Sequence, residues 1–205
     1  MSLITDLSVQ LGAELQACSA QVTTAESCTG GGIAEAITRV AGCSAWFEAG
    51  YVTYSNAQKT TMLQVPPELF VSHGAVSRPV VEAMARGAVK QSGARYGVAV
   101  SGIAGPSGGS QEKPVGTVCF AWADGEAVIS EQQLFDGDRE TVRRKSIEHA
   151  LNGLLSLLSG ARGKASAWLR ILPGILTMKK TAVVICRKTG IILVNYTVVC
   201  AASLA

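Results

Sequence analysis

The 205-residue sequence contains only two histidines, and its six cysteines include no C-x-x-C pair. A zinc site needs such residues in close groups, so the sequence argues against bound zinc. The cysteines are also too sparse for a small disulfide-stabilised scaffold, and we expect them to stay reduced. The sequence therefore predicts a site without a metal or another cofactor.

Acidic residues are missing from the end of the chain. Residues 161–205 carry seven Lys and Arg and no Asp or Glu, a charge of +7, whereas residues 1–160 carry 11 basic and 15 acidic residues, a charge of −4. The basic character belongs to this tail, and the rest of the chain has no basic stripe of the kind that binds nucleic acid. We expect a domain over residues 1–160 and a basic, apolar tail over 161–205, to which we assign no role.

An uninterrupted apolar run long enough for a membrane span is also missing. The apolar stretch of the tail is broken by Arg187 and Lys188, whereas a spanning helix needs about 20 apolar residues in succession. Only residues 190–205 are apolar enough to keep a span open. Residues 1–16 include Asp6 and Glu14, which is typical of an amphipathic helix and not of a signal peptide. We expect no membrane partner and a cytoplasmic location.

What the sequence does contain is a glycine-rich turn between a strand and a helix. The run 21–25 is typical of a buried strand, and apolar residues over 33–40 recur at helical spacing. The turn between them, residues 27–32, is Ser-Cys-Thr-Gly-Gly-Gly. We expect its N–H groups to lie free at the helix start, where they attract an anion or a developing oxyanion. Ser27 beside them fits serine acyl transfer, with a helix N-cap as the alternative.

Strand and helix patterns alternate along the rest of the domain. Further strands are predicted at residues 46–54, 96–103, 115–123 and 127–135. The last two form a hairpin around Asp124-Gly125. A final helix, capped by Asp136 or Asp138, carries an inward-facing apolar stripe to Leu158. This order predicts an α/β domain with a mixed sheet.

Six motifs carry a resemblance to a known family. They are AESCTGG (25–31), GYVTYSN (50–56) with Lys59, HGAVS (73–77), SGIAGP (101–106), KPVGTV (113–118) and FDGDR (135–139). In this order they closely resemble the CinA C-terminal domain and PncC family, over residues 3–160. The resemblance implies a three-layer α/β/α sandwich around a mixed, mostly parallel five-stranded sheet. The partner domain of full-length CinA is missing here, so the resemblance also implies a stand-alone protein.

The same resemblance implies an amidase that hydrolyses nicotinamide mononucleotide to nicotinate mononucleotide and ammonia, in pyridine nucleotide salvage and NAD metabolism. We expect Ser27 to be the nucleophile. No Ser-His-Asp set is evident, because neither His73 nor His149 is well placed, and we expect His149 on an exposed helix surface. Cys28 is the alternative nucleophile, but a thiolate needs a partner that lowers its pKa.

A Ser-Lys pair is the natural substitute for a triad. Lys59 lies in a short helix capped by Ser55 or Asn56, and we expect it to be the base. A free lysine has a pKa near 10.4, so Lys59 needs desolvation or cationic neighbours to act near neutral pH. Tyr54 is expected to orient Lys59 or to protonate the leaving group.

The nucleotide also offers a phosphate and a ribose, which glycine turns, helix N-termini and arginines commonly hold. The expected substrate-binding residues are Thr29, Gly30, Gly31, Ser55, Asn56, Ser101, Gly102, Gly105, Arg139 and Arg143.

Two other functions stay open from the sequence. One is a non-catalytic nucleotide-binding module, in which Ser27 and Thr29 are hydrogen-bond donors and Lys59 contacts the ligand. The other is a serine hydrolase of a different small amide. Release of ammonia from the nucleotide separates them from the amidase. The expected partners are a small-molecule nucleotide and further copies of the chain in a homo-oligomer, with no nucleic acid.

Overall fold

The computed structural model describes residues 2–171, 177–186 and 190–199. The chain divides into two compact units, residues 1–160 and 161–205. In the second unit, β6 (Thr177–Cys186) and β7 (Gly190–Val199) pair as an antiparallel hairpin. Among the residues described, no helix is both long and apolar enough to cross a membrane.

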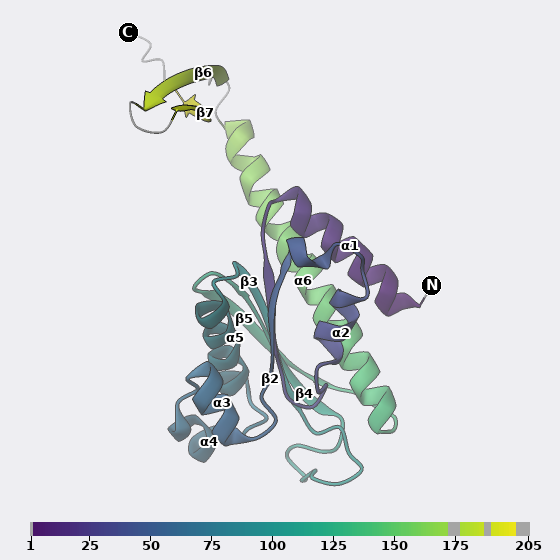
Figure 1. The fold of residues 1–205 in the computed structure, drawn as a ribbon. Helices are drawn as coiled ribbons and strands as arrows, with labels where there is room; N and C mark the ends of the chain where they lie inside the picture. The colour runs from purple at the N-terminus through teal and green to yellow at the C-terminus, as the bar shows by residue number, and fades with distance from the viewer. Residues whose placement is uncertain (1, 172–176, 187–189, 200–205) are drawn as a thin grey trace. The chain divides into compact units, whose positions relative to one another are not determined.

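A five-stranded sheet forms the centre of the first unit (Figure 1). Its strands are β1 (Val22–Glu26), β2 (Phe47–Val52), β3 (Tyr96–Gly102), β4 (Thr117–Asp124) and β5 (Ala127–Leu134), in the order β2-β1-β3-β4-β5. β1 runs parallel to β2 and β3, whereas β4 runs antiparallel to both β3 and β5. Only β4 is therefore reversed, and the predicted mixed, mostly parallel sheet is confirmed.

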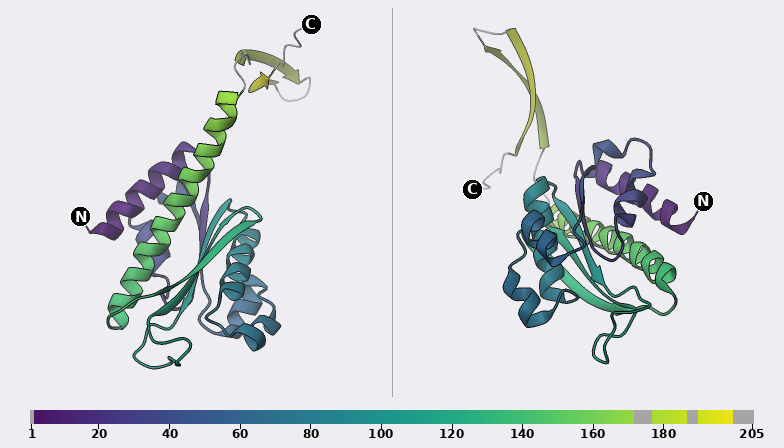
Figure 2. Two further views of the ribbon diagram at one scale, coloured as in Figure 1. Left: turned by 180° about the vertical axis from the view of Figure 1, so that it is seen from behind. Right: turned by 60° about the horizontal axis from the view of Figure 1, so that its bottom comes forward.

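Helices cover both faces of this sheet, and Figure 2 shows the same layers in two further views. The helices are α1 (Leu3–Ala17), α2 (Gly32–Thr38), α3 (Asn56–Leu63), α4 (Pro67–His73), α5 (Arg78–Ser92) and α6 (Arg139–Ile171), with a 3-10 turn η1 (Cys43–Ala45) before β2. The helices α1 and α2 and the part of α6 up to Gly160 lie on one face, and α3, α4 and α5 on the other (Figure 1). The three-layer α/β/α fold expected from the family resemblance is confirmed.

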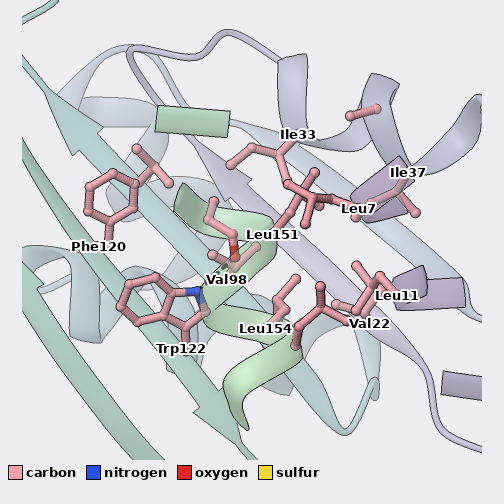
Figure 3. Close-up of a cluster of buried hydrophobic side chains, with 14 of the residues drawn as sticks. Leu7, Leu11, Val22, Ile33, Ile37, Val98, Phe120, Trp122, Leu151 and Leu154 are labelled. Atoms are coloured by element: carbon pink, nitrogen blue, oxygen red, sulfur yellow. Dashed lines mark hydrogen bonds between the residues drawn. The ribbon is translucent and has the colours of Figure 1, made fainter. Parts of the chain in front are cut away.

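The larger core lies between the sheet and α1, α2 and α6 (Figure 3). Side chains of β4 alternate between the two faces, as the pleat of a strand requires. Phe120 and Trp122 belong to this larger core, and the Trp122 indole donates a hydrogen bond to the Ala150 carbonyl of α6 at 2.9 Å. The smaller Cys119 and Ala121 face the second core, under α5.

The strand order positions the predicted catalytic motif. After β1 the chain moves to β2 on one side and then returns to β3 on the other, so the order reverses at β1. In open α/β sheets, ligands bind at such a reversal, beyond the carboxyl ends of the parallel strands. Residues 27–32 follow β1, and residues 53–54 follow β2. The fold therefore places both segments at this edge of the sheet.

Candidate active site

Ser27 and Lys59 are in contact, although they lie 32 residues apart in the sequence. The Lys59 Nζ lies 3.1 Å from the Ser27 Oγ. Ser27 follows β1, and Lys59 comes from α3, whose first turn is capped by the Ser55 hydroxyl. The exposed fraction is 1% for Lys59 and 9% for Ser27. The structure thus brings together the two residues predicted to be base and nucleophile.

Two backbone carbonyls hold the amine of Lys59 beside the serine. Lys59 Nζ donates to the carbonyl oxygens of Thr53, at 3.0 Å, and Tyr54, at 3.2 Å. No ion pair within the described residues involves Lys59. Burial lowers the pKa of Lys59, against an opposing contribution from Cys28. Lys59 can therefore lose its proton more easily than an exposed lysine, as a general base must.

Cys28, the alternative nucleophile, lies in a different environment. Its side chain is 6% exposed, and this burial raises the pKa of the thiol to about 12. A thiol with such a pKa carries almost no thiolate near neutral pH, and the thiolate is the reactive form. The geometry therefore favours Ser27 over Cys28 as the nucleophile.

The N–H groups at the start of α2 are not free, which corrects our expectation from the sequence. The buried carboxylate of Glu26 accepts hydrogen bonds from the N–H of Ile33, at 3.0 Å, and of Ala34, at 2.8 Å. It therefore satisfies donors that we expected to attract a ligand anion. Sequence reasoning missed Glu26, because it placed the strand at residues 21–25 and the turn at 27–32 and gave the residue between them no role.

Ser27 is not the N-cap of α2 either. That position belongs to Gly31, which adopts a left-handed conformation with φ of 92°. Within the part of the chain that the structure describes, the N–H groups of Cys28 and Thr29 donate to no other residue. Two free donors thus lie directly after the serine, outside the helix.

Tyr54 contacts Lys59 through its backbone, whereas its side chain points to an arginine. The Tyr54 hydroxyl accepts a hydrogen bond from Arg139 at 3.1 Å, and the ring is 61% exposed. Arg139, the first residue of α6, also donates to the Gly105 carbonyl at 2.9 Å. No described carboxylate forms an ion pair with Arg139. Three predicted site residues, from separate parts of the chain, therefore meet here.

Arg143 approaches the Ser27 turn from α6. It donates from Nη2 to the Thr29 carbonyl at 2.8 Å, while its buried Nε has no hydrogen-bond partner in the described residues. Beside it lies a pocket of about 440 Å³ lined partly by residues 30–32 and Ile147. Gly30 and Gly31 both have positive φ, of 60° and 92°, a conformation that favours glycine.

The remaining predicted residues have contacts that shape the site. Ser55 caps α3 by accepting from the Gln58 N–H at 3.2 Å, and Asn56 begins that helix. Ser101, which is buried, donates to the Ala75 carbonyl at 2.8 Å. A Cβ at Gly102 would lie 2.7 Å from Val118 Cγ2, so this position requires close packing of β3 on β4.

The expectation of an exposed His149 was wrong. Its ring is half-buried and lies 4.7 Å from the Phe120 ring, centroid to centroid, and its Nε2 contacts Glu131. Aromatic rings of the sheet pack against it, so this polar residue in mid-helix is partly covered. Elsewhere in the described residues, no group of three His, Cys, Asp or Glu could hold a metal ion.

The chain matches a known protein family. A model described as the CinA C-terminal domain matches residues 4–158. The chain is 68% identical over 157 residues to the nicotinamide-nucleotide amidohydrolase PncC of Pseudomonas putida, covering 77% of this chain and 98% of that protein. It is 56% identical over 155 residues to PncC of Escherichia coli K12, covering 75% and 93%.

Solved structures show the same fold. A CinA superfamily protein from Klebsiella pneumoniae 700603 superposes with a TM-score of 0.75 at 36% identity, covering 77% of this chain and 98% of that one. A competence/damage-inducible protein from Agrobacterium tumefaciens gives a TM-score of 0.74 at 42% identity, covering 77% and 96%.

Proposed function

Because this chain belongs to the CinA C-terminal domain family, we propose that it is a nicotinamide-nucleotide amidohydrolase. It hydrolyses nicotinamide mononucleotide to nicotinate mononucleotide and ammonia, which returns the pyridine ring to NAD metabolism. Relatives named as this amidohydrolase are 53% to 68% identical to it. The observation that carries the proposal is the buried contact between Lys59 Nζ and Ser27 Oγ.

The first half of the reaction forms an acyl-enzyme. Neutral Lys59 removes the proton of Ser27 while the Oγ attacks the carboxamide carbon, and the carbonyl oxygen becomes an oxyanion. The unused N–H groups of Cys28 and Thr29 follow the nucleophile directly and are the proposed oxyanion donors. Protonated Lys59 then gives its proton to the departing nitrogen, which leaves as ammonia when the C–N bond breaks.

The second half hydrolyses the ester formed with Ser27. Lys59 is neutral again after ammonia has left, so it can take a proton from water as the water attacks the acyl carbon. The C–O bond to Ser27 then breaks, the serine recovers a proton from Lys59, and nicotinate mononucleotide leaves. One amine thus serves both halves, which explains why a single buried base is enough.

The substrate phosphate requires a cation that is not already neutralised. Arg139 fits this role because it is exposed, has no ion pair among the described residues and keeps donors beyond those used by Tyr54 and Gly105. The exposed Tyr54 ring beside it offers an apolar face to the pyridine or ribose. Tyr54 is therefore proposed as a substrate contact, with its carbonyl orienting Lys59.

The setting of the enzyme follows from the same proposal. Cys18, Cys28, Cys43 and Cys119 are all free thiols, which agrees with a reducing compartment such as the cytoplasm. A small nucleotide is the proposed partner, without nucleic acid or a membrane. Assembly into a homo-oligomer stays a prediction, which light scattering of the purified protein tests.

Ammonia release tests the function directly. Purified protein is given nicotinamide mononucleotide, nicotinamide riboside or nicotinamide, and ammonia is measured with a coupled assay. We expect rapid release from the mononucleotide, slower release from the riboside, which lacks the phosphate, and least from nicotinamide. Binding of the mononucleotide without ammonia would favour a nucleotide-binding module. If the protein neither binds nor hydrolyses the mononucleotide, a hydrolase of another amide is favoured.

A further inference from the structure

Thr29, two residues after the nucleophile, is held from both sides. Its hydroxyl donates to Glu26 Oε2 at 2.7 Å, and its carbonyl accepts from Arg143 Nη2 at 2.8 Å. The exposed fraction of Thr29 is 0%. A buried hydroxyl that already has an acceptor, and a carbonyl that already has a donor, have little left to offer a ligand. The hydroxyl and carbonyl of Thr29 therefore stabilise the turn.

Glu26 joins this turn to its two neighbouring elements. As the last residue of β1 it is fixed in the sheet, and its carboxylate accepts from the Thr29 hydroxyl and from the N–H groups of the second and third residues of α2. Hydrogen bonds to an ionised acceptor are roughly twice as strong as neutral ones. The exposed fraction of Glu26 is 0%, so water does not compete for these bonds. Strand, turn and helix are thereby held in one arrangement.

Arg143 supports the turn from the opposite side to Lys59. Lys59 belongs to α3, which lies on one face of the sheet, and Arg143 belongs to α6 on the other (Figure 1). The next residue, Arg144, behaves differently, because its guanidinium pairs with Glu148 and is half exposed. Arg143 instead places its guanidinium beside Gly30, where an added Cβ would lie 3.6 Å from Nη2.

We infer that Glu26, Thr29 and Arg143 are positioning residues, which set the Ser27 turn so that its Oγ stays within hydrogen-bond reach of Lys59. This inference rests on the proposed function, and it revises two residues that the sequence assigned to substrate binding. Arg143 acts through the Thr29 carbonyl, and the phosphate is left to Arg139. A base must lie within hydrogen-bond reach of its proton, and a displacement of about 1 Å can cost about 100-fold in rate.

Two substrates separate positioning from phosphate binding. Arg143→Met and Thr29→Val are compared with wild type on nicotinamide mononucleotide and on nicotinamide riboside, which lacks the phosphate. We expect kcat to fall about 10- to 100-fold on both substrates, with KM nearly constant and the preference for the mononucleotide retained. Arg139→Met should instead raise KM for the mononucleotide and remove that preference. A loss in Arg143→Met that is confined to the mononucleotide and appears in KM would overturn the inference.

Conservative variants control for simple unfolding. Thr29→Ser keeps the hydroxyl that Glu26 accepts from, and Arg143→Lys keeps a donor for the Thr29 carbonyl, so both should recover most of the lost kcat. Arg144→Met, on the next residue of α6, should leave kcat and KM unchanged. If Thr29→Ser and Arg143→Lys are as slow as Thr29→Val and Arg143→Met while all remain folded by circular dichroism, these hydrogen bonds do not position the serine.

A reagent without phosphate tests the turn independently of the natural substrate. With phenylmethanesulfonyl fluoride, the Ser27 Oγ bonds to sulfur, the S–F bond breaks, fluoride leaves and Lys59 takes the proton. The labelling rate, followed by mass spectrometry, should fall in Arg143→Met and Thr29→Val but not in Arg144→Met. Equal labelling in all four proteins, wild type included, would refute the positioning role. A wild type that is labelled but releases no ammonia would refute the proposed function alone.

Discussion

Lys59 Nζ lies 3.1 Å from Ser27 Oγ, and both side chains are almost completely buried. Burial has a chemical consequence here, because a low-dielectric environment disfavours the charged amine and lowers the pKa of Lys59. Two carbonyls and a hydroxyl surround the amine instead of carboxylates. A carboxylate beside the amine would stabilise its protonated form. None of the described contacts of Lys59 Nζ is with a carboxylate, which favours the neutral form that a base needs.

Ser27→Ala should lower kcat at least about 1,000-fold, because removing a covalent nucleophile has effects of that order or larger. Cys28→Ala should keep most of the activity, since a thiol with a pKa of about 12 is protonated near neutral pH. Ammonia release measures both variants, with thermal melts to verify folding. Turnover that survives in Ser27→Ala and is lost in Cys28→Ala would reverse the assignment.

The value of kcat/KM should rise with pH through one ionisation of Lys59, below the ordinary lysine value of about 10.4, because the base must be neutral to accept a proton. Lys59→Arg keeps a charge but cannot give up its proton, so it should fail as a base. The deciding measurement is kcat of a folded Lys59→Arg at saturating substrate. A value within about tenfold of wild type, about 1.4 kcal/mol of barrier, would reduce Lys59 to a binding residue.

Lys59 should also make stability depend on pH. Its pKa is lower in the folded protein than in the unfolded chain, so the unfolded chain binds more protons between the two values. Stability must then rise with pH across that window and lose this contribution below it. Lys59→Met removes the titrating group, and urea titrations from pH 7 to 10 should show a smaller rise than wild type. Equal slopes in the two proteins would mean that burial does not perturb Lys59.

Much of this fold was predictable, because strands and helices leave periodic patterns. The hairpin predicted around Asp124-Gly125 is formed by β4 and β5, which end and begin at Asp124 and Ala127. The contact between Ser27 and Lys59 was predictable only through the family motifs. Sequence spacing alone does not show that α3 lies against the end of β1. Glu26 could not be assigned, because two of its three partners are backbone N–H groups, which leave no mark in the sequence, and the third is the hydroxyl of Thr29, which the sequence assigned to substrate binding.

The same limit explains the other differences. Lys59 is oriented by carbonyl oxygens, and every residue has a carbonyl, so no residue type signals that contact. Arginine near a helix start is equally compatible with a phosphate, an ion pair or a backbone acceptor. In the structure Arg143 reaches Thr29 and Arg144 reaches Glu148, although the two arginines are adjacent. The face of α6 on which each lies decides its role.

Truncation after Gly160 should leave folding and activity near wild type. The family model ends at residue 158, and every site residue that we propose precedes Gly160. A second truncation, after Ala150, is the matched control, because it removes the buried Leu151, Leu154 and Leu158 of the larger core and should abolish folding. Melting temperature and ammonia release measure both. A large fall in melting temperature or activity in the protein truncated after Gly160 would show that residues 161–205 contribute to the domain or its site.

Gly153 and Gly160 both lie in α6 and offer a matched test of the larger core. A methyl group at Gly153 would overlap the Trp122 indole, whereas in the described surroundings of Gly160 nothing lies within 4 Å of an added Cβ. Overpacking of a core costs about 1–3 kcal/mol, while glycine to alanine within an open stretch of helix gains up to about 1 kcal/mol. Gly153→Ala should therefore lower the free energy of unfolding, and Gly160→Ala should leave it unchanged or raise it. Urea denaturation measures both.

Gly153→Ala combined with Trp122→Phe should lose less free energy of unfolding than the sum of the two single losses, because the smaller ring makes room for the methyl group. Additive losses would mean that the cost of Gly153→Ala does not come from its overlap with the Trp122 indole.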